Sequence, residues 1–287
     1  PQLKNILKQV KMVAPTDLTV VIQGESGTGK ELIARLIHQQ SKRRNKPFVA
    51  IDCGAIPETL VESHLFGYEK GAFTGATGSK EGFFEQANGG TLFLDEITNL
   101  PIESQKIFLR VIEQKKFKPV GSKSNKDVNV RLITASNVSL TDSVAKGEFR
   151  EDLFHRLTEF HIFLPPLKNR DGDISLLAKH FVSKYSREFE KNIKGISEDA
   201  LGMIKDYHWP GNIREMINVI RRAVLLCKRD YIRPEDLSIM DLKKTSSENK
   251  DDKLSFLNPD GERTFDDLVS DVETEIIKNA LKKTGGN

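Results

Sequence analysis

Short apolar runs rich in β-branched residues alternate with amphipathic segments over the first 165 residues. The apolar runs have the length and composition of buried strands, and we expect strands at 18–23, 47–52, 91–95, 128–134 and 159–164. Between several of them, apolar positions recur at helical spacing, which predicts helices at 31–41 and 103–115. Buried strands that alternate with helices are typical of an α/β fold with a parallel sheet.

The pattern changes after Pro165 and Pro166, and the chain from Asp173 onward has helical periodicity alone. We expect helices at about 173–190, 197–207 and 212–228. A segment of linker composition follows, and then an amphipathic helix that begins at Thr264, with Asp267 completing a capping box. The predicted organisation is an α/β part, a helical part, a linker and the start of a further domain, at 1–168, 169–240, 241–262 and 263–287.

A glycine-rich run separates the first predicted strand from the first predicted helix. It consists of Gly24, Glu25, Ser26, Gly27, Thr28, Gly29 and Lys30. In this context glycines let successive backbone N–H groups close around phosphate oxygens, and the helix start and the lysine add positive charge. The alternative is a glycine-rich turn that opens an ordinary helix. Glu31 stands where most phosphate-binding loops place a Ser or Thr for Mg²⁺.

Two adjacent carboxylates, Asp95 and Glu96, end the strand predicted at 91–95. Ligands bind at the carboxyl ends of strands in α/β sheets, so Asp95 is placed to hold Mg²⁺, through water, and Glu96 to orient a hydrolytic water. A strand that ends in a solvated acidic turn is the alternative. A GTPase would carry Asn-Lys-x-Asp, and the run Asn125-Lys126-Asp127-Val128 breaks that pattern, which favours ATP as the nucleotide.

Composition narrows the class of protein further. Of 287 residues, 30% are charged and 38% hydrophobic, and no apolar run approaches the roughly 20 residues of a membrane span. Two cysteines, Cys53 and Cys227, and no signal peptide predict a cytoplasmic protein, and the six histidines have no zinc-ligand spacing. A net charge of +3 is too small to argue for nucleic-acid binding. The start at Pro1 without Met suggests an excised fragment.

Three linked motifs resemble the central AAA+ ATPase domain of bacterial enhancer-binding proteins, the activators of sigma-54 RNA polymerase. They are the phosphate-binding loop with its following glutamate, a Gly-Ala-Phe-Thr-Gly-Ala loop, and a Trp-Pro-Gly-Asn-Ile-Arg-Glu run, at 24–31, 71–76 and 209–215. The resemblance covers about residues 1–238. It implies an AAA+ P-loop NTPase fold with a C-terminal all-helical lid, and an ATP- and Mg²⁺-dependent activator that remodels the sigma-54 holoenzyme so that promoter DNA can open.

The same resemblance implies that the loop at 71–76 is an exposed finger, moved by the state of the nucleotide, which contacts sigma-54. Its residues are Gly71, Ala72, Phe73, Thr74, Gly75 and Ala76. The residues by themselves also allow a surface turn whose Phe73 folds back into the core. The polar stretch 119–127 corresponds to a second loop of the family.

Other site residues are carried over from the family position by position. Arg150 and Arg156, by themselves a solvated helix face, match arginine fingers that reach the neighbouring subunit's γ-phosphate, which implies a hexameric or heptameric ring. Ser136 and Asn137 align with sensor I.

Arg214 has a separate argument. Asn212 is expected to cap the helix that begins there, which places Arg214 in the first turn, where its charge opposes the helix dipole. An anion nearby would relieve this, and the family places nucleotide phosphates there (sensor II).

Asp52 departs from the family, which typically has an Asn there that bonds the catalytic glutamate and couples nucleotide state to the loops. Two carboxylates so close would repel unless they share a proton or a cation. Two other functions compete with the motor: an assembly or DNA-binding regulator that uses ATP only as a ligand, and a small-molecule kinase. The segment 264–283 resembles the start of a Fis-like DNA-binding domain, which would bind enhancer DNA in a longer protein.

Overall fold

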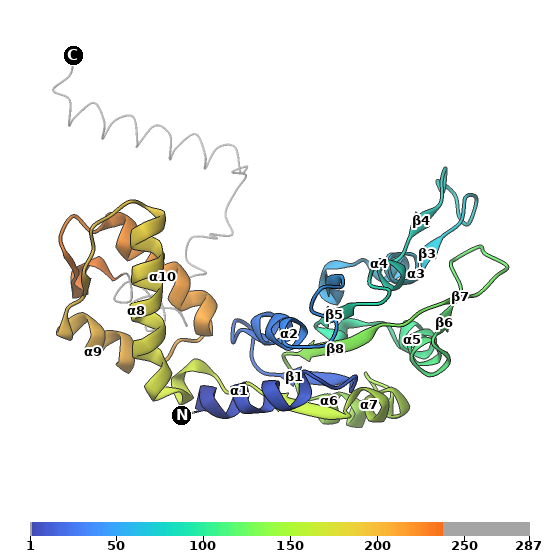
Figure 1. Cartoon of the computed structure of the whole chain (residues 1–287), viewed down its shortest axis with the longest axis horizontal. Coiled ribbons are helices and arrows are strands. Elements are labelled where there is room, and N and C mark those ends of the chain that lie inside the picture. Colours follow the sequence, from blue (N-terminus) through green and yellow to red (C-terminus); the bar gives the residue numbers. More distant parts are fainter. Residues whose placement is uncertain (1, 238–287) are drawn as a thin grey trace, which may run out of the picture. The chain divides into compact units, whose positions relative to one another are not determined.

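A five-stranded parallel sheet is the centre of the fold in the computed structural model, which describes residues 2–237 (Figure 1). The strand order is β2-β5-β8-β1-β9, and every neighbouring pair is parallel. The strands are β1 Val20–Gln23, β2 Phe48–Asp52, β5 Thr91–Asp95, β8 Arg131–Ser136 and β9 Phe160–Phe163. All five predicted strands are confirmed, and parallel pairing brings their carboxyl ends to one edge of the sheet.

Helices cover both faces of this sheet, because side chains alternate between its faces along each strand. Val20 and Ile22 of β1 pack with the buried residues of α1 and α2, whereas Val21 packs with those of α3, α5 and α7 on the opposite face. The helices of this part are α1 Gln2–Val13, α2 Lys30–Gln39, α3 Val61–Phe66, α4 Phe83–Gln86, α5 Ile102–Gln114, α6 Leu140–Ala145 and α7 Glu151–Leu157. The helices predicted at 31–41 and 103–115 are confirmed as α2 and α5.

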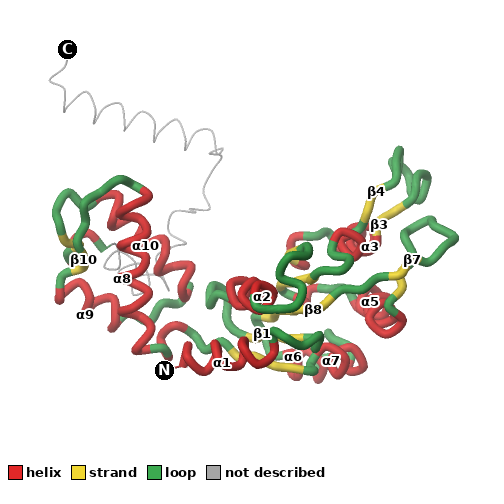
Figure 2. The backbone as a smooth tube through the Cα atoms, in the orientation of Figure 1, coloured by secondary structure: helices red, strands yellow, loops and turns green. Residues whose placement is uncertain are grey.

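Two short antiparallel pairs, which the sequence pattern did not predict, carry the loops (Figure 2). They pair β3 Gly67–Tyr68 with β4 Lys80–Glu81, and β6 Lys116–Phe117 with β7 Lys126–Asp127. The two pairs lie together, because Val120 donates its amide to the Gly67 carbonyl and accepts the Glu69 amide. The loop at 71–76 and the stretch 119–127 are therefore joined at their bases.

The helical part consists of α8 Asp171–Glu188, α9 Glu198–Asp206 and α10 Asn212–Leu226, close to the predicted ranges. Trp209 is buried between α9 and α10 and donates its ring N–H to the Ile204 carbonyl at 2.8 Å. The expectation of helix alone was wrong in one detail, because β10 Gly195–Ile196 pairs in parallel with β11 Tyr231–Ile232. Single 3₁₀ turns lie at Cys53–Ala55, Glu58–Leu60, Ile97–Asn99, Leu167–Asn169 and Pro234–Asp236.

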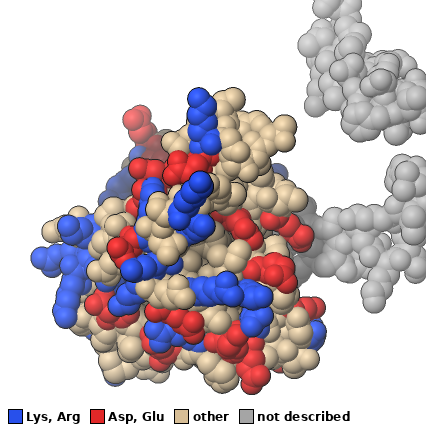
Figure 3. All heavy atoms as spheres, turned by 90° about the vertical axis from the view of Figure 1, so that its right-hand side faces the viewer, with Lys and Arg blue, Asp and Glu red and all other residues tan. Residues whose placement is uncertain are grey.

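The predicted linker and the helix from Thr264 lie outside the described residues, and the division at 168 stays a prediction. None of the helices between residues 2 and 237 combines the length and apolar character that crossing a membrane requires. On the face seen in Figure 3, Lys and Arg side chains are interspersed with Asp and Glu, without a large area of one sign.

Arg131 connects the sheet to α1 through two hydrogen bonds. Its guanidinium is buried at the start of β8 and donates to the carbonyls of Val13 and Ala14 at 2.8 and 2.7 Å. These carbonyls lie at the end of α1, where the helix dipole favours a cation. Burial lowers the pKa of Arg131 to about 10, which leaves it charged at neutral pH.

We predict that Arg131→Met lowers the free energy of unfolding by about 2–4 kcal/mol, because two charge-assisted hydrogen bonds to the end of α1 are lost, and the Val13 carbonyl keeps only its bonds from Thr16. Urea unfolding of the variant beside wild type measures the effect. Arg44→Met, at an exposed arginine, is the matched control and should stay within about 0.5 kcal/mol of wild type. Equal midpoints for the two variants would contradict this account.

Candidate nucleotide site

The glycine-rich run forms a tight loop between β1 and α2, at the carboxyl edge of the sheet. Its conformation requires glycine at two positions. Gly27 and Gly29 have φ of 76° and 96°, in the left-handed region that favours glycine. A Cβ on Gly27 would also lie 2.4 Å from the Gly211 carbonyl oxygen, whereas a Cβ on Gly29 would make only ordinary contacts, 3.7 Å from Ile213 and 3.9 Å from Leu32. The loop therefore turns closely against the start of α10.

Lys30 points into this loop, and its side chain is shielded from solvent. The residue is only 7% exposed, and its ammonium donates to the carbonyls of Gly24 and Glu25 at 3.0 and 3.2 Å. Burial lowers the pKa of Lys30, while Asp95 and Glu96 act in the opposite direction. A partly desolvated ammonium inside a loop of backbone amides suits a phosphate group.

Glu25, Ser26, Thr28 and Glu31 have different surroundings. Thr28 donates its hydroxyl to the Glu25 carbonyl at 2.7 Å, which helps to close the loop. Glu31 forms an exposed ion pair with Arg35 at 2.7 Å, one turn further along α2. Its place in the nucleotide site stays a prediction.

The start of α10 is hydrogen-bonded to the loop. The amides of Ile213 and Arg214 donate to the Gly27 carbonyl at 2.9 and 3.3 Å. The Arg214 guanidinium donates to the Ser26 hydroxyl at 3.0 Å, so this predicted sensor residue does lie beside the phosphate-binding loop.

The expectation that Asn212 caps α10 was wrong. The cap residue is Gly211, without a side-chain bond, and Asn212 is the first residue of the helix, with φ of 54°. The buried Asn212 amide instead accepts the Leu167 amide at 2.7 Å and donates to Glu25 and to the Ser26 carbonyl. It joins the loop to the segment before α8, because the amides that it would cap already bind Gly27.

Three carboxylates lie at the ends of β2 and β5. Asp52 and Asp95 are direct neighbours in the register of these strands, and Glu96 follows with φ of 52°. Burial raises the pKa of Asp95; Lys30 opposes this, and Asp52 and Glu31 add to it. The excess of negative charge fits a divalent cation with oxygen ligands.

Among the described residues, no group of three or more His, Cys, Asp and Glu side chains is arranged to hold a metal ion by itself. This agrees with a Mg²⁺ ion that takes one or two carboxylates and completes its ligands with water and substrate phosphates. Asp95, at the end of β5, is the residue here that would hold it.

Glu96 is bonded to a residue that the sequence analysis missed. Asn99 donates its side-chain amide to a Glu96 carboxylate oxygen at 2.9 Å. Asp52, at the position of the family's Asn, instead accepts the Gly54 amide at 2.9 Å. In the sequence, the contact between Asn99 and Glu96 could have been suspected only from the presence of an Asn side chain three residues after Glu96.

The predicted sensor I residues end β8. The Ser136 carbonyl accepts the Gly24 amide at 3.1 Å, and its hydroxyl bonds the backbone of Val138. Asn137 is exposed immediately after the strand. Both therefore lie at the strand end that adjoins the phosphate-binding loop.

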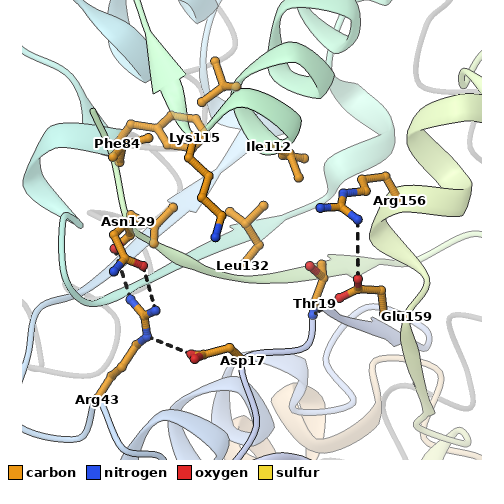
Figure 4. A pocket seen from close by; sticks show the side chains of 13 residues that line it. Asp17, Thr19, Arg43, Phe84, Ile112, Lys115, Asn129, Leu132, Arg156 and Glu159 are labelled. Carbon is orange, nitrogen blue, oxygen red and sulfur yellow. Dashed lines mark hydrogen bonds and ion pairs between the residues drawn. The ribbon is translucent and has the colours of Figure 1, made fainter. Parts of the chain in front are cut away.

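Arg150 and Arg156 do not bond the loop of their own chain. Arg150 pairs with Asp152 at 2.7 Å, and Arg156 lies 3.7 Å from Glu159. Arg156 lines a cavity of about 320 Å³ into which Lys115 also points (Figure 4). Glu159 accepts the amide of Thr19, so this cavity adjoins the start of β1, at the opposite edge of the sheet from Lys30.

An apolar cavity of about 360 Å³ adjoins the phosphate-binding loop at Thr28 and Gly29. Leu32 is one of the apolar positions at helical spacing in α2, but its side chain is 65% exposed and lines the cavity. The other apolar lining comes from α1, α2, α8, α10 and the end of β9, and includes Leu3, Leu7, Leu36, Leu164, Leu177 and Ile213. The cavity has the size and character of a site for a planar base.

The loop at 71–76 is closed by its own backbone, because the Gly71 amide donates a hydrogen bond to the Ala76 carbonyl at 2.9 Å. Phe73 is 42% exposed and meets the Tyr68 ring edge-on at 5.0 Å, so it is not part of the core. Thr74 is exposed beside it. A Cβ on Gly121 would lie 2.8 Å from the Ala72 Cβ, so the stretch 119–127 packs against this loop.

The parallel sheet, the phosphate-binding loop and the adjacent carboxylates define a P-loop NTPase fold of the AAA+ class. Residues 1–163 match the model of the sigma-54 interaction domain, and residues 168–254 match that of the AAA+ ATPase lid domain. The chain belongs to the family of sigma-54 interaction domains.

Several known proteins are similar to the chain over most of its length. The regulatory protein AtoC of Escherichia coli is 44% identical over 287 residues, which is all of this chain and 61% of AtoC. The activator HyfR of Escherichia coli is 52% identical over 79% of this chain and 34% of HyfR. The crystal structure of NtrX from Brucella abortus with ATP has a TM-score of 0.78 and 33% identity, over 90% of this chain and 57% of NtrX. The chain thus spans about three fifths of AtoC.

We predict that Gly27→Ala weakens ATP binding at least about tenfold, which is about 1.4 kcal/mol. The new Cβ would strike the Gly211 carbonyl and part α10 from the loop. Gly89→Ala is the control, because Gly89 has φ of 77° with open space around it. Titration of a fluorescent ATP analogue measures both, and equal affinities would refute the steric argument.

Proposed function

We propose that this chain is an ATP-hydrolysing motor that remodels the sigma-54 RNA polymerase holoenzyme. The observation that carries the proposal is the short connection between the nucleotide edge and the exposed finger. Asp52 ends β2 beside Asp95, and the same segment continues through α3 to Gly67 and the loop at 71–76. A change at the carboxylates has a covalent path of about twenty residues from Asp52 to Phe73.

The chemistry follows from the residues at the edge of the sheet. The loop amides and Lys30 bind the phosphates, and Asp95 holds a Mg²⁺ ion through water. The ion, when bound, neutralises charge on the β- and γ-phosphate oxygens. Glu96 orients the attacking water and accepts its proton, and Arg214 contacts the phosphates from α10. The apolar cavity at Leu32 and Ile213, which adjoins the phosphate-binding loop at Thr28 and Gly29, receives the adenine. The NtrX structures with ADP and with ATP support an adenine nucleotide as the ligand.

Hydrolysis in this proposal requires a ring, hexameric or heptameric, because Arg150 and Arg156 act on the nucleotide of the neighbouring subunit. The role is supported by the pairing of both guanidinium groups with carboxylates of their own segment, Asp152 and Glu159, and not with the phosphate-binding loop of their own chain. A guanidinium is suited to it, because its planar fork matches the spread charge of a transferring phosphoryl group.

The finger delivers the change to sigma-54 through Phe73 and Thr74, one apolar and one hydroxyl contact. We further propose that residues 263–287 begin a DNA-binding domain through which a longer protein binds enhancer DNA. The second proposal is supported by the similar protein HyfR, which is named a DNA-binding transcriptional activator.

We predict that Thr74→Ala keeps ATP turnover within about twofold of wild type but loses binding to sigma-54 in the presence of ADP and aluminium fluoride. The side chain is exposed and distant in sequence from the phosphate-binding loop, so only the partner contact is removed. Native gel shift with purified sigma-54 measures binding. The control is Thr141→Ala, at an exposed threonine of α6.

Retained sigma-54 binding by Thr74→Ala would show that the loop is structural here. A wild-type protein that binds ATP and assembles, but does not hydrolyse it, would instead support the regulator that uses ATP only as an assembly ligand.

We predict that Arg156→Ala binds ATP but does not hydrolyse it, and that Lys30→Met does neither. Mixed rings should regain turnover, because a subunit with an intact phosphate-binding loop then adjoins one with an intact arginine. Phosphate release at several mixing ratios measures this complementation. If the mixture stays inactive while both variants still enter rings, Arg156 does not act between subunits.

A further inference from the structure

Three polar side-chain atoms meet beside Gly54, at the carboxyl edge of the sheet. A Cβ placed on Gly54 would lie 2.7 Å from the Asn99 amide nitrogen, 2.9 Å from a Glu96 carboxylate oxygen and 3.3 Å from an Asp52 carboxylate oxygen. The space is open only because residue 54 has no side chain. Of the three, only Asn99 has N–H donors, since ionised carboxylates only accept.

The turn that carries Asn99 is firmly held. Glu96 has φ of 52°, and the backbone amide of Asn99 donates to the backbone carbonyl of Glu96 at 2.9 Å, which closes the turn. Ile97 and Leu100 on either side of the turn are buried in the core that also contains Leu94. The Asn99 side chain therefore reaches Glu96 from a fixed position.

Asp52 cannot perform this task. Its carboxylate is bonded to the Gly54 amide, and it carries the same charge as Glu96. Asn99 is the side-chain hydrogen-bond donor to Glu96 among residues 2–237. Without it, repulsion from Asp52 and Asp95 would turn the Glu96 carboxylate away.

We infer that Asn99 is the positioning residue of Glu96: it holds one carboxylate oxygen and leaves the other for the attacking water. The inference rests on the proposed ATPase activity. A neutral amide fixes the carboxylate without adding a full positive charge that would compete with the Mg²⁺ ion. Because Gly54 lies in the segment that leads from Asp52 to α3, the same contact places the state of Glu96 next to the path toward the finger.

The first test is Asn99→Ala in the assembled ring, with ATP turnover and nucleotide binding measured separately. We expect kcat to fall on the order of 10–100-fold with KM within about twofold, because the substrate still binds while the water is poorly oriented. Asn45→Ala, at an exposed asparagine between α2 and β2, is the matched control and should leave both unchanged.

Gly54→Ala tests the same contact without altering any of the three side chains. Its new methyl group should push Asn99 and Glu96 apart and lower kcat to a similar extent. Asn99→Asp should be at least as slow as Asn99→Ala, because it adds a carboxylate. Combining it with Asp52→Asn returns one amide and one carboxylate to the cluster, and turnover should recover in part.

Such recovery is expected if turnover depends on the hydrogen bond donated to Glu96, and it is not expected if turnover depends only on the shape of the turn. If wild-type rings hydrolyse ATP and both Asn99→Ala and Gly54→Ala keep the wild-type kcat, the inference is overturned and the proposed function is left intact. A wild-type ring with no turnover would overturn the proposed function itself.

Discussion

The carbonyl of Gly27 is the point on which the nucleotide site depends, because two amides at the start of α10 donate to it. Helix-terminal amides need partners, and here the phosphate-binding loop supplies one. The same contact brings Arg214 to Ser26 and Ile213 to the apolar cavity. A loop formed by residues 24–29 thereby acquires its second wall from a helix nearly 190 residues further along the chain.

Charge is unbalanced inside this frame. Lys30 is the buried cation within the loop, while Asp52, Asp95 and Glu96 gather at the neighbouring strand ends. The raised pKa of Asp95 and the lowered pKa of Lys30 have one cause, the removal of both groups from water. A divalent cation with a polyphosphate would satisfy both, since the cation meets the carboxylates and the phosphate meets the lysine.

The finger and the second loop are one mechanical unit at their bases. The backbone of Val120 is hydrogen-bonded to Gly67 in β3 and to Glu69 directly after it, and Ala72 closely approaches Gly121. The two loops are therefore joined at Gly67 and Glu69, where the segment from Asp52 ends. Gly54 lies at the start of this segment, and the Asn99 and Glu96 side chains from the turn after β5 adjoin it.

The amino-acid pattern was sufficient where the physical requirement is local. The five strands follow from runs of buried β-branched residues, and the phosphate-binding loop follows from glycines that must adopt a positive φ. The paired carboxylates at Asp95 and Glu96 follow from their place at a strand end. None of these depends on which distant segment packs nearby.

Tertiary packing decided the rest. Asparagine is a residue type that often caps helices, yet the side-chain amide of Asn212 is hydrogen-bonded to Leu167 and Glu25, which lie 45 and 187 residues away. Leu32 matches a buried stripe but lines a cavity, because α1, α8 and α10 leave space beside it. No sequence pattern marks Asn99. Its hydrogen bond to Glu96 arises from a turn whose neighbouring residues Ile97 and Leu100 are buried in the core. The sequence by itself thus determined the strands and the phosphate-binding loop, because local backbone preference is written in each segment; the partners of Asn212, Leu32 and Asn99 depend on contacts that only the folded chain creates.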